Sequence, residues 1–346
     1  PPWTGSAGAG RPRICPPPTK AGGPRMPGDG TPAPSYRGVG LLLVLATALI
    51  SGISTFVNAY AVHGTSSDAF VTVRNLAVTG LILPLAVVAR RSLARPLGRA
   101  DWARLVVIGF VGGAVPFLLF FHGLALATAA GGGLTASFLY RTLFLMATVF
   151  GVVYLGERLR PRVAVAAGLL LGGNYLLMSL AAPVWTDGTP YVVLATVLWA
   201  VEYTISKRTL RDIPSGIVAV GRMGIGGAFL VGYLALTSQL SGVGTLNSGQ
   251  WIWVLISAGL LAAFVGTWYA GLRRVDLGVA TSVLVLGFPV TWLLSVLVAG
   301  HSFTFLQAAG AAAVVVGTAL VAGLAMLRQG WAVLAQRARV GSGRTV

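Results

Sequence analysis

Charged residues are scarce in this chain. Only 10% of its 346 residues are charged, and 8 of them are acidic. An ordinary soluble domain carries about 25% charged residues, which form its surface. Their scarcity here therefore excludes a soluble globular protein. Hydrophobic residues make up 55% of the sequence, and the mean hydropathy is +0.82. This composition predicts a polytopic membrane protein.

Cysteine, histidine and enzyme motifs are scarce too. The single cysteine, Cys15, excludes an internal disulfide and a cysteine-based metal site. Three scattered histidines argue against a structural zinc site. The sequence has no H-E-x-x-H, P-loop or G-x-S-x-G pattern. We therefore expect no metal, no cofactor, no catalytic residues and no ATP-driven pump.

The two ends of the chain differ in composition from its middle. Residues 1–37 are rich in proline and glycine and are basic, which predicts a disordered tail with Met26 as a candidate true start. A signal peptide is the alternative, because Ala59-Tyr60-Ala61 has the pattern of a cleavage site, although the apolar stretch before it is long for one. Residues 328–346 form a basic C-terminal tail.

Ten apolar segments lie between these tails, each long enough to cross a bilayer as a helix. The expected fold class is therefore an all-α polytopic membrane protein with ten transmembrane helices. The predicted spans are Gly38–Tyr60, Phe70–Ala89, Trp102–Phe121, Leu134–Tyr154, Arg162–Leu180, Pro190–Ser206, Ile217–Leu240, Trp251–Leu272, Leu277–Ala299 and Phe303–Leu327.

Basic residues follow a simple pattern along the chain. The formal net charge is +17, and all but three of the 25 basic residues lie in the tails or at the connections after the second, fourth, sixth and eighth segments. The alternate connections carry none. Because basic residues collect in cytoplasmic loops, the pattern predicts a multi-pass protein of the cytoplasmic (inner) membrane with both termini inside. The net positive charge thus indicates the orientation of the protein in the membrane. We therefore expect the lipid bilayer, and not nucleic acid, as its partner.

Short matches between the two halves of the chain share nearly one offset. The pentapeptide LATAL at residues 45–49 recurs as LATVL 149 residues later, and Gly156-Glu157 matches Gly300-His301 144 residues later. Five helices per half would insert the second half upside down, an arrangement typical of secondary transporters. We therefore predict two inverted five-helix repeats, over residues 38–182 and 186–327.

Four ionisable side chains lie clearly inside the predicted spans: Arg74, Arg141, Glu202 and Arg222. A charge in lipid is costly, so such residues face a cavity or a partner. Glu202 and Arg222 lie at similar depth on consecutive spans, which predicts an ion pair. Anchoring of the helix ends is the alternative role for Arg74 and Arg222.

Arg141 lies deeper, and no acidic residue is at matching depth. Together with its neighbour Tyr140 it is a candidate for binding a carboxylate or phosphate of a solute. A hydrogen bond to backbone carbonyls, or a misplaced span boundary, is the alternative explanation. Trp199, Tyr203 and Trp292 are candidate solute-binding residues along the pathway, with packing as their alternative role.

Several motifs resemble those of the EamA-type carriers in the drug/metabolite transporter superfamily. Tyr154–Leu159 is similar to the family's LGE-x-L motif after the fourth helix. Pro289 followed by Gly300-His301 resembles its P…GE motif, with histidine in place of glutamate. Arg74 resembles an arginine early in the second helix, and Trp199 a tryptophan of the sixth. The resemblance runs from about residue 38 to residue 327.

The resemblance implies a ten-helix carrier of amino acids, other metabolites or drugs. The net intramembrane charge further favours an anionic or zwitterionic solute. We therefore expect a secondary transporter, an exporter working by alternating access, as a monomer or homodimer. Glu202 is the candidate for proton coupling, with uncoupled exchange as the alternative, and Glu157 is either structural or coupling. A polytopic enzyme acting on lipids or isoprenoids, and a channel, are the rival functions.

Overall fold

The computed structural model describes residues 34–61, 67–93, 95–158, 161–178, 182–244, 246–298, 300 and 302–342. Every regular element within these ranges is helical, as the composition predicts. Most of the predicted N-terminal tail and His301 lie outside them. The elements are α1 Pro34–Ala61, α2 Ser67–Arg90, α3 Arg99–Ile108, η1 Gly109–Ala114, α4 Val115–Ala129, α5 Gly133–Arg141, α6 Leu143–Leu155, α7 Pro161–Leu177, α8 Thr189–Thr209, α9 Ser215–Val220, η2 Gly221–Ile225, α10 Gly226–Leu236, α11 Ser241–Gly244, α12 Ser248–Leu272, α13 Leu277–Leu284, α14 Gly287–Leu297 and α15 Phe305–Ser342.

Eight helical stretches within the described ranges are long and apolar enough to cross a membrane. They are Tyr36–Asn58, Asp68–Arg90, Arg99–Ala129, Gly133–Leu155, Ser215–Leu236, Ser248–Leu272, Leu277–Leu297 and Phe305–Gly323. The third was predicted to end at Phe121, which is wrong, because the apolar residues after His122 continue the helix to Ala129.

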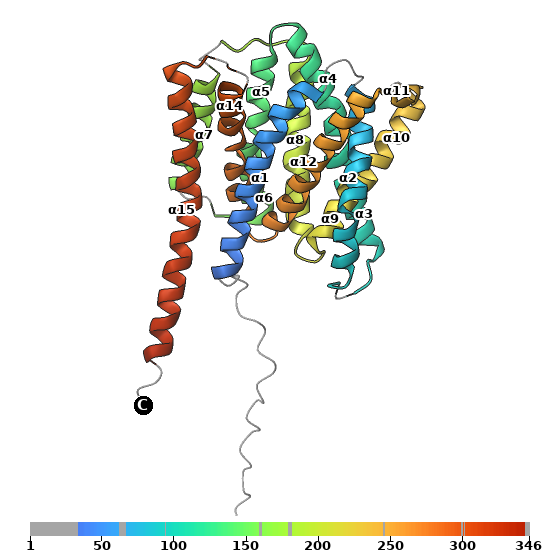
Figure 1. The fold of residues 1–346 in the computed structure, drawn as a ribbon. Coiled ribbons are helices and arrows are strands. Elements are labelled where there is room, and N and C mark those ends of the chain that lie inside the picture. Colours follow the sequence, from blue (N-terminus) through green and yellow to red (C-terminus); the bar gives the residue numbers. More distant parts are fainter. Residues whose placement is uncertain are drawn as a thin grey trace, which may run out of the picture. The chain divides into compact units, whose positions relative to one another are not determined.

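The other two predicted spans are helices as well, but they do not meet this criterion. The apolar part of α7, Val163–Leu177, is short, and α7 packs along α15 (Figure 1). Helix α8 has 21 residues but carries Glu202, Lys207 and Arg208. It contacts α3, η1, α4, α5, α6 and α13. Because protein surrounds α8, its side chains need not be apolar enough to face lipid. The count of ten spans therefore remains a prediction.

Two of the predicted spans are interrupted helices. The fourth breaks at Thr142, between α5 and α6, and the ninth breaks at Val285-Leu286, between α13 and α14. The Thr142 hydroxyl donates to the Leu139 carbonyl at 2.7 Å, and Pro289 follows the second break. Around both breaks the backbone makes tighter i to i+3 hydrogen bonds, such as Leu145 N–H to the Thr142 carbonyl at 2.9 Å and Leu286 N–H to the Val283 carbonyl at 3.1 Å.

Two π-helical turns, η1 and η2, cross each other at glycine residues. A Cβ on Gly113 would meet the Arg222 carbonyl oxygen and, at 3.1 Å, the Cα of Gly226. A Cβ on Gly112 would fall on the Glu202 side chain. Only glycine permits these approaches. Such π turns occur often at functional sites.

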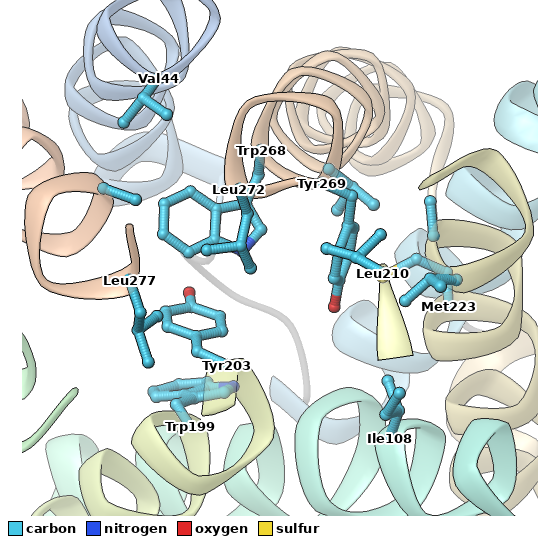
Figure 2. Packing of buried hydrophobic residues seen from close by; sticks show 14 of the residues in the cluster. Val44, Ile108, Trp199, Tyr203, Leu210, Met223, Trp268, Tyr269, Leu272 and Leu277 are labelled. Carbon is cyan, nitrogen blue, oxygen red and sulfur yellow. The ribbon is translucent and has the colours of Figure 1, made fainter. Parts of the chain in front are cut away.

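The largest hydrophobic cluster joins α8 to α12. Trp199 and Tyr203 of α8 face Trp268 and Leu272 of α12 (Figure 2). The Tyr203 and Trp268 rings lie 4.6 Å apart between their centroids. Large rings in van der Waals contact fix the spacing of these helices, and so the position of the polar groups beside them.

Replacing Gly113 with alanine is expected to destabilise the protein by about 1–3 kcal/mol, because the new methyl group overpacks the η1–η2 crossing. Gly259→Ala is the control, since nothing lies within 4 Å of a Cβ at that helical position. Thermal unfolding of the purified variants in detergent measures the difference. Equal stability of the two variants would contradict the crossing.

Candidate functional site

A cavity of about 870 Å³ lies among α1, α2, α4, α5, α8, η2 and α12. Its lining includes Tyr203, six residues before the end of α8, and Arg222 in η2. It extends to Asn58 near the end of α1 and Thr128 near the end of α4. The charge pattern predicts that these two helix ends lie on the outer side of the membrane. A cavity of this size accommodates a small organic solute.

Three arginines from different helices line this cavity: Arg74 from α2, Arg141 from the end of α5 and Arg222 from η2. The Arg74 side chain is buried, and its guanidinium lies 5.4 Å from the ring centroid of Phe117. The Arg141 guanidinium lies 3.6 Å from the centroid of Phe288. Aromatic faces thus hold both guanidiniums in the wall of the cavity.

Arg74 and Arg141 have no carboxylate partner among the described residues. The Nε atoms of both are buried and unbonded within the same ranges. A nearby polar contact of Arg74 is a long hydrogen bond, at 3.4 Å, from its Nη2 to the Asn75 side-chain oxygen. Uncompensated guanidiniums that line a cavity are suited to binding an anion.

Four aromatic rings form the wall between the arginines. Trp199 lies 5.4 Å from Phe117, 5.4 Å from Phe120 and 5.3 Å from Tyr140, between ring centroids. Phe120 and Tyr140 lie 4.9 Å apart. These edge-to-face and tilted pairs are geometries that aromatic rings favour. The wall offers an apolar or aromatic solute extensive contact next to positive charge.

The predicted ion pair between Glu202 and Arg222 is present. The Arg222 Nε lies 3.6 Å from Glu202 Oε2, and both side chains are buried. Glu202 Oε1 accepts hydrogen bonds from Tyr269 at 2.6 Å and from Ser206 at 2.5 Å. Glu202 does not line the cavity, so it lies behind Arg222. The pair compensates one of the three cavity charges.

The π turn η1 connects this pair to the aromatic wall. The carbonyl oxygen of Gly112 accepts hydrogen bonds from Arg222 Nη2 at 3.1 Å and from Trp199 Nε1 at 3.2 Å. The next carbonyl, of Gly113, accepts one from Asn75 at 3.3 Å. A single carbonyl of the π turn thus contacts both a cavity arginine and a cavity tryptophan. Sequence reasoning missed this role, because π turns have no simple sequence signature.

Glu157 lies outside the cavity and caps another helix. Its two carboxylate oxygens accept the backbone N–H groups of Leu277 at 2.5 Å and Gly278 at 3.0 Å, at the start of α13. Burial raises the pKa of Glu157, while the Gly278 and Leu277 N–H groups act in the opposite direction. A carboxylate at a helix N-terminus satisfies orphan donors and complements the helix dipole. This placement supports the structural interpretation of Glu157.

The structure brings six predicted residues to one cavity and leaves the others elsewhere. Tyr140, Trp199 and Tyr203 line it together with the three arginines. Trp292 does not line it, and its ring packs on Phe303, 5.8 Å away between ring centroids, so its role as a solute-binding residue stays a prediction. Pro289 is buried in α14 and also lies outside the lining.

Sequence reasoning left the anchoring of helix ends open as an alternative role for both Arg74 and Arg222. Both are buried and line the cavity, which disfavours that role. It did not identify Phe117, Phe120 and Phe264 as lining residues. These phenylalanines lie in long apolar runs, where nothing in the sequence separates a residue that faces a cavity from one that faces lipid.

Comparison with known proteins identifies the family. The model of the EamA-like transporter family matches this chain twice, over residues 38–179 and 187–323. The chain belongs to the EamA-like transporter family. This EamA-like protein is therefore a multi-pass membrane transporter and not an enzyme.

Two further matches are consistent with this assignment. The protein is 29% identical to the aromatic amino acid exporter YddG of Ancylobacter novellus over 252 residues, which cover 67% of this chain and 81% of that exporter. A solved crystal structure superposes on this EamA-like chain with a TM-score of 0.65, at 21% identity, covering 83% of this chain and 98% of the other. The second match shows a shared fold.

Removing the charge of Glu202 is expected to leave Arg222 buried without its counter-charge. Glu202→Gln should lower the free energy of unfolding by about 3 kcal/mol or more. The double variant Glu202→Gln with Arg222→Gln should lose less than the sum of the two single variants, which thermal unfolding in detergent measures. Additive losses would contradict a coupled pair.

Replacing one carboxylate oxygen of Glu157 with an amide nitrogen is expected to leave the N–H of Leu277 or Gly278 without an acceptor. Glu157→Gln should cost about 1–3 kcal/mol of stability. The control is Asp276→Asn at the same helix terminus, where the side chain makes no capping hydrogen bond. If thermal unfolding finds the two variants equally stable, Glu157 does not cap this helix.

Proposed function

We propose that this protein is a secondary carrier that exports small solutes with a negatively charged group and an aromatic or apolar body. The observation that carries the proposal is the cavity in which Arg74, Arg141 and Arg222 adjoin the wall around Trp199. A guanidinium binds a carboxylate with charge-assisted hydrogen bonds, and the rings bind the body of the solute. The similarity to an aromatic amino acid exporter supports both the class of solute and the direction.

Alternating access between two inverted five-helix repeats is the mechanism that we propose. The repeats are residues 38–182 and 186–327, and the two matches of the family model support this division. The breaks in the fourth and ninth spans, at Thr142 and Val285, lie 143 residues apart. Gly156 and Gly300, which lie 144 residues apart, both have a φ of +69°. Corresponding irregularities at one offset favour a structural repeat.

The cavity reaches one end of the bundle, and polar contacts close the other. Near that other end, Lys207 at the end of α8 donates to the carbonyls of Leu272 and Val275, both at 2.6 Å. Glu157, two residues after the end of α6, accepts the N–H of Leu277 at the start of α13, two residues after Val275. A carrier must break such contacts to open its second side. These contacts support an outward-open state, with both termini inside as the charge pattern predicts.

Glu202 remains the candidate for coupling transport to protons. Its contacts with Arg222, Tyr269 and Ser206 support the role of ion-pair partner. A coupling role, uncoupled exchange and the oligomeric state, monomer or homodimer, stay predictions.

Loss of Arg141 is expected to impair transport. Arg141→Gln should reduce counterflow of aromatic carboxylates in proteoliposomes by about tenfold or more, because the variant loses a charge-assisted bond to the solute. Arg91→Gln is the matched control, since Arg91 is exposed and lies outside the cavity lining. Full counterflow by the Arg141 variant would contradict the assignment of this residue to the solute site.

A further inference from the structure

The charge of the cavity wall has one sign. Twenty described residues line it, three of them arginines and none of them aspartate or glutamate. The nearest described acid with a contact to a cavity charge is Glu202, which lies behind Arg222 and is occupied by it and by two hydroxyl donors. Arg74 and Arg141 therefore contribute positive charge that no carboxylate in the described part of the chain compensates.

An amino acid would bring an ammonium group into this wall together with its carboxylate. Its natural protein partners are a carboxylate, a free carbonyl or an open aromatic face. The wall holds no carboxylate. Part of the aromatic surface is already in use, because the Arg74 guanidinium lies within 5.9 Å of the centroids of Phe70, Phe117 and Phe121.

The polar groups of α1 in the wall are also partly occupied. The Asn58 side-chain oxygen accepts a hydrogen bond from Ser257 at 2.7 Å. The Thr55 hydroxyl donates to the Ser51 carbonyl at 2.8 Å, so that carbonyl has a side-chain partner as well. What remains for an ammonium group is hydroxyl oxygen and the faces of Phe120, Tyr140 and Trp199, in the field of two guanidiniums that no described carboxylate compensates. In a low-dielectric site this repulsion between like charges disfavours the zwitterion.

We infer that the cavity selects aromatic carboxylic acids without an ammonium group, such as aryl 2-hydroxy acids or 2-oxo acids, over the corresponding amino acids. The inference rests on the proposed function, and it specifies the solute that the same cavity takes. The carboxylate binds between uncompensated guanidiniums, and the ring packs against the wall of Phe120, Tyr140 and Trp199.

The test compares two solutes that differ in one group. L-phenyllactate and L-phenylalanine have the same ring, carboxylate and chirality, with a hydroxyl in one where the other has an ammonium. Counterflow of each is measured in proteoliposomes holding the full chain at neutral pH, and binding of each is measured by thermal shift in detergent. We expect phenyllactate to bind about tenfold or more tightly and to exchange faster.

The same comparison of the two solutes in three protein variants shows which residues cause the preference. Arg74→Gln and Arg141→Gln each remove one cavity charge and should shrink the ratio of phenyllactate to phenylalanine affinity. Arg91→Gln, outside the cavity, should leave the ratio unchanged. The ratio is measured on protein that elutes as a single folded species, and the wild-type ratio alone decides the inference if a variant does not fold.

Each outcome bears on the inference. Preference for phenyllactate, reduced by the cavity variants, supports it. Equal or better exchange of phenylalanine overturns the inference and leaves the proposed function standing, since an aromatic carboxylate is still carried. If neither solute is exchanged, both the inference and the proposed function are overturned. A preference for phenyllactate that both cavity variants retain in full overturns the assignment to these arginines.

Discussion

Burial of guanidinium charge inside a membrane protein is the constraint on which the rest of this structure depends. An arginine in a low-dielectric interior must find a partner or a cavity. Arg222 finds Glu202 and the carbonyl of Gly112, and these contacts require glycine at the η1–η2 crossing. Arg74 and Arg141 find aromatic faces and the cavity instead. The helix irregularities and the glycine contacts therefore lie where charge must be accommodated.

The same constraint bears on α8, which carries Glu202, Lys207 and Arg208 and is not among the apolar spans found in the described residues. Its side chains supply one acid for the ion pair, the ring of Trp199 for the aromatic wall and the ring of Tyr203 for the packing against α12. Such a helix cannot face lipid over its length, and the structure surrounds it with other helices. Helix α8 therefore has two roles: Glu202 compensates the charge of Arg222, and Trp199 and Tyr203 supply rings for the cavity wall and for the packing against α12.

The two interrupted helices both adjoin the contact of a cavity arginine. Arg141 is the last residue of α5, directly before the break at Thr142, and its guanidinium lies over Phe288, which follows the break between α13 and α14. The cavity arginine is therefore placed by two irregularities from opposite halves of the chain.

The sequence by itself determined the class of protein, the helical segments and the family resemblance, because hydropathy, basic loops and short motifs are local properties. It also predicted the Glu202–Arg222 pair, since both residues lie at similar depth on consecutive spans. Only the tertiary structure decided that Arg74, Arg141 and Arg222 share one cavity, that Trp292 packs elsewhere, and that phenylalanines form the wall. The reason is rotational: a uniformly apolar helix carries no signal for which face meets lipid and which meets a cavity.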